Sequence, residues 1–267
     1  MTAPPLLVIA HRGDSAHRPE NTLASFAGAL EVGATVVELD VQLTADGHVV
    51  VLHAATLDRT TSGRGDVRRL PLAEVRAVSA GYPDRFGDAW AGERVPLLSD
   101  ALALMRGRAR VLVEIKTESV TGDAEGGIEA RVAEEVRRAG MEDRVALISF
   151  DHRAIVRLRS LAPEMARGRL FRRTSADEVL SAPRDASCDP VPPHKSQVTD
   201  RLAERVHAAG LKLATGVVDD PEELRHLARF GLYGVGSNRP GVLLDAIADG
   251  LLAPPAEARA QGIGAAP

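Results

Sequence analysis

The segment Val-Val-Glu-Leu-Asp-Val-Gln, residues 36–42, has the pattern of a β-strand that carries Glu38 and Asp40 between apolar residues. Residues two apart in a strand point to the same face, so these carboxylates are expected to lie side by side. Adjacent carboxylates repel each other unless a cation lies between them or one of them keeps a proton. A hard divalent cation is one solution, and a strand with a hydrated acidic face is the simpler one.

The segments on both sides of this strand predict a regular alternation of strands and helices. Upstream, the apolar run at 6–10 is typical of a strand buried on both faces, and Asn21 is a good N-cap for a helix that Gly33 ends. Downstream, short apolar runs alternate with helical patterns, which include helices over 128–139 and 152–161. The predicted strands of the alternation cover residues 6–10, 36–42, 110–116, 145–149, 166–171, 185–188, 211–215 and 232–236.

Eight strand–helix units predict an α/β fold of the (β/α)8 TIM-barrel type. Alternating strands and helices imply a parallel sheet, and eight units in about 250 residues is the usual size of a TIM barrel. A doubly wound open sheet is the alternative, although no Gly-x-Gly-x-x-Gly follows the first strand. We expect one barrel domain over 1–252, with a small insertion at about 54–94 after the second strand and its Asp-Gly hairpin, and a disordered tail over 253–267.

The composition of the 267 residues narrows the class of protein. Aromatic residues are only 3%, so the core must be mostly aliphatic, and a net charge of −4 gives no general attraction to nucleic acid. The single cysteine, Cys188, excludes an internal disulfide. The apolar run at 6–10 is too short for a signal-peptide core, and no window approaches a transmembrane span. We therefore expect a cytoplasmic protein without stable membrane insertion.

Polar side chains gather where the early predicted strands end. Active sites of TIM barrels lie at the carboxyl ends of the strands, so these side chains are expected to meet at one mouth. Each alone is readily explained as a rim histidine or a structural salt bridge, but buried charges are costly unless they are paired or bound to metal. The residues concerned are His11, Arg12, Glu38, Asp40, His53, Glu114 and Lys116.

Several motifs together resemble the signature of the glycerophosphodiester phosphodiesterase family, whose fold is a PI-PLC-like TIM barrel with a small insertion after the second strand. The match runs in order through the first half of the chain and resumes near its end. The motifs are His-Arg-Gly at 11–13, Pro-Glu-Asn-Thr at 19–22, Glu-Leu-Asp at 38–40, Thr-Ala-Asp-Gly at 44–47, His53, Leu-Asp-Arg-Thr-Thr at 57–61, Pro-Leu-Leu at 96–98, Glu-Ile-Lys at 114–116, Ser-Phe-Asp at 149–151, Asp-Asp-Pro-Glu at 219–222 and Arg-Pro at 239–240.

The resemblance implies a role for each residue at the mouth. Glu38, Asp40 and Glu114 would bind one divalent cation, Mg²⁺ or Ca²⁺. The general acid and base would be His11 and His53. Phosphate would be held by Arg12, with Lys116 beside the phosphate and the metal-ligating Glu114.

The implied reaction is hydrolysis of a small-molecule glycerophosphodiester to glycerol 3-phosphate and an alcohol. The attacking nucleophile can be water, or it can be the neighbouring glycerol hydroxyl, which would give a cyclic phosphate. The sequence decides neither this point nor the oligomeric state. A phosphodiesterase or phospholipase D-like enzyme that acts on lysophospholipids or another small phosphodiester is an alternative. A non-catalytic barrel that binds a phosphorylated ligand is a third, and it predicts the loss of site residues that are all present.

The chain departs from the family pattern at three places. Ala54 stands where the family usually has Asp after the second catalytic His, and Gly216 stands where it usually has Trp. Ser237-Asn238 replaces the usual Thr-Asp before Arg-Pro. Loss of the Trp removes a flat apolar wall of the substrate pocket, which concerns substrate choice more than metal and histidine chemistry. Ala54 removes a possible orienting carboxylate for His53 or a neighbour.

Overall fold

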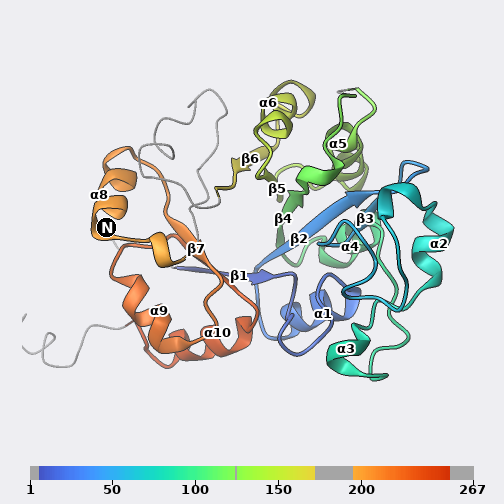
Figure 1. Cartoon of the computed structure of the whole chain (residues 1–267). Coiled ribbons are helices and arrows are strands. Elements are labelled where there is room, and N and C mark those ends of the chain that lie inside the picture. The colour runs from blue at the N-terminus through green and yellow to red at the C-terminus, as the bar shows by residue number, and fades with distance from the viewer. Residues whose placement is uncertain (1–5, 124, 172–194, 253–267) are drawn as a thin grey trace, which may run out of the picture.

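The computed structural model describes residues 6–123, 125–171 and 195–252. Within these residues seven mutually parallel strands form one curled sheet in the order β6-β5-β4-β2-β1-β8-β7, and the helices lie around its outside (Figure 1). The α/β prediction with a parallel sheet is confirmed. The strands are β1 (Leu7–His11), β2 (Val36–Leu43), β4 (Arg110–Ile115), β5 (Val145–Ser149), β6 (Ala166–Arg169), β7 (Ala214–Gly216) and β8 (Gly234–Ser237).

The helices pack an aliphatic stripe against the sheet. In α5 (Ile128–Ala139) the buried residues Ile128, Val132 and Val136 recur every four positions, and Gly140 ends the helix with φ 62°. The other helices that follow the parallel strands are α1 (Leu23–Glu31), α4 (Leu98–Met105), α6 (His152–Leu161), α8 (Asp200–Ala208), α9 (Pro221–Ala228) and α10 (Pro240–Ala248). Among the helices of the described residues, none combines the length and the hydropathy needed to cross a bilayer.

The predicted insertion is bonded to the second strand through β3 (Val49–Val51), which runs antiparallel to β2. After β3 come the 3₁₀ turn η1 (Val67–Arg69), α2 (Leu72–Ala77) and α3 (Pro83–Phe86), which lie together at one side of the sheet (Figure 1). The insertion contributes Leu57, Val67, Val75 and Ala80 to a small cluster that also contains Val50, Leu52 and Val95. The insertion therefore uses β3 as one wall of its core.

The structure corrects two local predictions. Thr22, and not Asn21, caps α1, because its hydroxyl accepts from the Ser25 N–H while Asn21 has φ 59° and bonds Asp40 instead. The strand β7 begins three residues later than predicted, since its parallel ladder starts where Ala214 meets Gly234 at the beginning of β8. The predicted strand over 185–188 and the predicted tail over 253–267 lie outside the described residues, so the single-domain assignment stays a prediction.

Candidate active site

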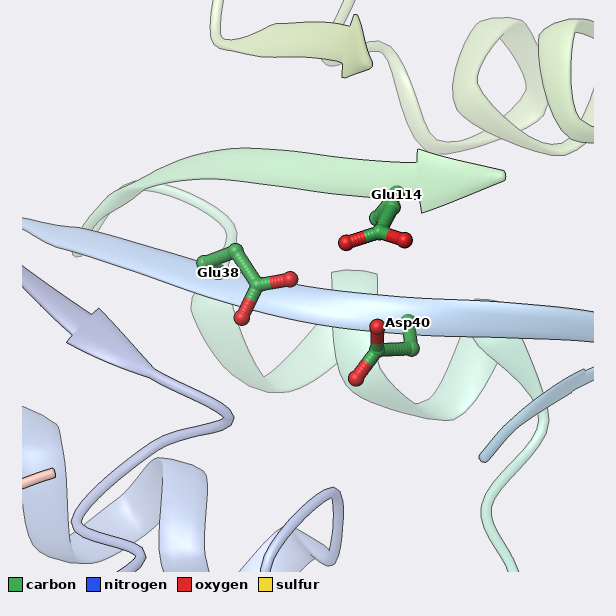
Figure 2. Close-up of side chains that lie close together, drawn as sticks. All are labelled: Glu38, Asp40 and Glu114. Carbon is green, nitrogen blue, oxygen red and sulfur yellow. The ribbon is translucent and has the colours of Figure 1, made fainter. Parts of the chain in front are cut away.

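Three buried carboxylates meet near the carboxyl ends of β2 and β4. Glu38 and Asp40 share one face of β2, and the strand register places Asp40 opposite Glu114. One oxygen of each lies within 4.8 Å of the others, and the three residues are 6%, 0% and 8% exposed. Figure 2 shows the carboxylates of Glu38, Asp40 and Glu114 around a common space. This carboxylate triad could hold a metal ion.

The triad carries more negative charge than the surrounding protein compensates. Burial and the charges of Asp40 and Glu114 raise the pKa of Glu38 well above its usual value. Burial and Asp40 raise the pKa of Glu114 to about 7. For Asp40, the opposing effect of burial is outweighed by Arg12 and Lys116, which hold its pKa at about 2. A buried all-oxygen group with excess negative charge fits a hard divalent cation.

Two cationic side chains border the triad. The Nζ atom of Lys116 donates to Glu114 at 2.6 Å and to Asp40 at 3.3 Å. The Nε atom of Arg12 lies 3.1 Å from Asp40 Oδ2, while its Nη1 donates to Glu20 at 2.9 Å. Glu20 also accepts from Arg59 of the insertion, at 2.9 and 2.6 Å. The insertion thus helps to hold Arg12 beside the triad.

The two predicted histidines also lie close to these charges. His11 is the last residue of β1, and its Nδ1 is 2.8 Å from Asn238 Oδ1. His53 follows β3, whose end is held to β2 because the Leu52 N–H donates to the Asp40 carbonyl at 3.0 Å. Burial lowers the pKa of His11, and burial also lowers the pKa of His53 to about 4 although Asp40 opposes it. The structure therefore gathers all seven predicted site residues in one region.

A polar pocket of about 530 Å³ opens beside this region. Its walls include residues that were not among the predicted site residues. Arg85 of α3, in the insertion, reaches the segment after β1 and donates to the carbonyls of Ser15 and Ala16 at 3.0 and 2.8 Å. The irregular sequence around α3 carries no pattern from which this position could be inferred. The lining residues are His11, Arg12, Ser15, Ala16, Glu20, Arg85, Asp219, Asn238 and Arg239.

The backbone of Gly236 leaves little space for a side chain at position 216, where the family pattern usually has Trp. Gly216 pairs with Gly236 across the β7–β8 ladder, and a Cβ atom at position 216 would lie 3.1 Å from the Gly236 backbone. Such a contact is tighter than a side chain normally makes, so two glycines face each other where the family usually presents a Trp.

The stability of the metal-free protein is expected to depend on pH through Glu114. Its pKa is about 7 in the folded chain against an ordinary 4.5, so between these values the folded chain binds more protons than the unfolded chain. Stability therefore falls as pH rises through this window, by about 3 kcal/mol from Glu114 alone. Urea unfolding in EDTA across this window measures how steeply the free energy of unfolding changes with pH. The variant Glu114→Gln should make this dependence weaker. Equal slopes in both proteins would contradict this account.

Comparison with known proteins places this arrangement in a family. The model of the glycerophosphoryl diester phosphodiesterase family matches residues 11–242. A glycerophosphodiester phosphodiesterase of Caldanaerobacter subterraneus subsp. tengcongensis is 35% identical over 245 residues, which are 91% of this chain and 98% of the relative.

Solved structures agree with this family and with the TIM-barrel prediction. An Oleispira antarctica phosphodiesterase in complex with the product sn-glycerol-3-phosphate superposes with a TM-score of 0.82 at 31% identity, covering 92% of this chain and 97% of that one. A glycerophosphodiester phosphodiesterase from Agrobacterium tumefaciens has a TM-score of 0.77 at 30% identity, covering 90% of this chain and 100% of its own. The chain belongs to the glycerophosphoryl diester phosphodiesterase family and is an enzyme of the phosphoric diester hydrolase class.

Proposed function

We propose that this enzyme hydrolyses glycerophosphodiesters to glycerol 3-phosphate and an alcohol. The observation that carries the proposal is the buried carboxylate triad with Arg12, Lys116 and His11 around it, at the border of a polar pocket. The reaction is supported by relatives, since the Caldanaerobacter protein bears the name of this activity and the Oleispira enzyme binds sn-glycerol-3-phosphate as product.

Glu38, Asp40 and Glu114 would hold one divalent cation, Mg²⁺ or Ca²⁺. Both are hard cations that prefer carboxylate oxygens, and the raised pKa values of Glu38 and Glu114 support a positive charge there. When bound, the cation would neutralise charge on the phosphoryl oxygens and so stabilise the transition state.

Arg12 and Lys116 would bind the phosphate from the protein side. A guanidinium presents several N–H donors in a fixed plane, which suits the oxygens of a phosphodiester. Glu20 holds Nη1 of Arg12 at 2.9 Å, so the plane of the guanidinium is oriented before substrate arrives. Lys116 brings a compact charge beside Glu114, and its ammonium can follow a phosphoryl oxygen by a small rotation of the side chain.

His11 and His53 would carry the two proton transfers. One ring must take a proton from the attacking nucleophile, and the other must give a proton to the leaving alkoxide. The lowered pKa values of both rings favour the neutral form, which is the form a general base needs. The negative charge of a bound phosphodiester would favour protonation of the second ring, which then serves as the acid.

A coupled assay for glycerol 3-phosphate tests the proposal. We expect the purified enzyme with Mg²⁺ or Ca²⁺ to release glycerol 3-phosphate from glycerophosphocholine, glycerophosphoethanolamine or glycerophosphoglycerol. Activity on a lysophospholipid or another small phosphodiester alone would favour the alternative enzyme. Saturable binding of these diesters without turnover would instead indicate a binding protein.

A further inference from the structure

We propose that Asp219 is a positioning residue for His11, and that it acts through the side-chain amide of Asn238. The inference rests on the proposed role of His11 in proton transfer. His11, Asn238 and Asp219 follow or end three neighbouring strands, because β1 pairs with β8 and β8 pairs with β7. Each of the three residues lines the pocket.

Asp219 determines which way the amide of Asn238 points. Its Oδ1 accepts from the Asn238 backbone N–H at 2.7 Å and from the Ser237 hydroxyl at 3.0 Å, and its Oδ2 accepts from Asn238 Nδ2 at 2.9 Å. A carboxylate has no proton to donate, so the atom of the amide that faces Asp219 must be the NH₂ group. The carbonyl oxygen Oδ1 of Asn238 must then face the other way.

The orientation of Asn238 determines in turn which nitrogen of His11 carries the proton. Asn238 Oδ1 lies 2.8 Å from His11 Nδ1. Since an amide oxygen can only accept, Nδ1 must be the donor, and a neutral ring then keeps its lone pair on Nε2. The Ser15 hydroxyl lies 3.0 Å from the same oxygen and 2.8 Å from the His11 carbonyl, so its single proton is shared between two acceptors. Neutral His11 is thereby held in the tautomer that can accept a proton at Nε2.

This arrangement gives a physical meaning to the departure at Asn238. The family usually has Asp at this position. In this chain the neutral amide touches His11 and the carboxylate stands behind it, on Asp219. The pair therefore contains one neutral acceptor aimed at Nδ1 and one carboxylate that is separated from the ring by the amide.

The variant Asp219→Asn removes the carboxylate that orients the amide of Asn238. The new amide must keep its oxygen toward the Asn238 N–H and the Ser237 hydroxyl, so its NH₂ group would face the NH₂ group of Asn238. Asn238 relieves this clash by turning, which presents its NH₂ to His11 Nδ1 and moves the ring proton to Nε2. We expect kcat to fall by about 10²-fold, because the base is lost, with little change in KM.

The tautomer can be read directly by ¹⁵N NMR of the histidine ring in the resting enzyme at about pH 8, where the imidazole is neutral. We expect the Nδ1–H form in the wild type and the Nε2–H form in Asp219→Asn. The matched control is Asp220→Asn, the same change at the next residue, where the carboxylate caps α9 by accepting from the Glu223 N–H at 2.9 Å. Asparagine caps helices equally well, so this control should keep the wild-type tautomer and kcat.

The reciprocal double variant Asp219→Asn/Asn238→Asp is the decisive rescue. It again provides one carboxylate and one amide, with an acceptor toward His11 Nδ1, so the Nδ1–H tautomer and most of kcat should return. An Nε2–H tautomer in the wild type would overturn the proposal without any variant, as would Asp219→Asn with an unchanged tautomer and kcat. Because the tautomer is read in the resting protein, failure to hydrolyse any glycerophosphodiester would count against the proposed function alone.

Discussion

Alanine in place of His11 or His53 is expected to lower kcat by about 10²–10⁴-fold, the usual contribution of one general acid or base. His11 ends β1 and His53 follows β3, so the two rings approach the triad from different elements and neither can replace the other. The loss for His11 should appear in kcat rather than KM, because its Nδ1 is engaged by Asn238 and only Nε2 is available to the pocket.

The fold should survive both substitutions. His11→Ala removes one partly buried hydrogen bond, which is worth about 1 kcal/mol. Steady-state kinetics with glycerophosphocholine, together with urea unfolding, separates a chemical effect from a structural one. His226→Ala provides a matched control, since His226 is exposed on α9 and packs edge-on to Phe230. Near-normal turnover of both His11→Ala and His53→Ala would refute the assignment of the acid and base.

Removal of divalent cations is the second change with a large expected effect. Treatment with EDTA should reduce turnover to background, because the charge of the buried triad would then repel the anionic phosphodiester. One divalent ion, Mg²⁺ or Ca²⁺, should restore it. Full activity of the metal-free protein would contradict a metal site at Glu38, Asp40 and Glu114.

Calorimetric titration of the metal alone gives a readout that does not depend on turnover. Glu38→Gln removes a ligand charge from the triad and should weaken binding of the cation strongly. The matched control is Glu118→Gln, which makes the same change on the exposed 3₁₀ turn η2 (Thr117–Ser119) after β4. Equal affinity of both variants for the cation would place the metal elsewhere.

Local sequence signals were sufficient for most of the elements. The helices α5 and α6 have the predicted bounds, because an amphipathic stripe, a cap and, for α5, a terminal glycine agree at each end. The alternation of residues in β2 likewise predicted that Glu38 and Asp40 share one face. Because active sites of TIM barrels lie at the carboxyl ends of the strands, Glu114 was expected to lie near them, as it does. The family resemblance supplied the functional roles of these residues.

Long-range contacts account for what local patterns missed. Asn21 looks like a helix cap, but its side chain bonds both the carboxylate and the backbone N–H of Asp40, nineteen residues away. Arg85 reaches the pocket only because the insertion folds back on β3. No pattern within a short window encodes such contacts, since they depend on which elements become neighbours in the sheet.

The sequence by itself determined the strand–helix alternation, the family and the pair of carboxylates at Glu38 and Asp40, because periodicity and motif spacing are properties of neighbouring residues. Only the tertiary structure decided that one oxygen of each triad carboxylate lies within 4.8 Å of the others, and that Asp219 reaches His11 through Asn238. The physical reason is that hydrogen bonds and charge interactions act over a few ångströms in space. The residues that they join can be far apart in the chain, as His11 and Asn238 are, at 227 positions.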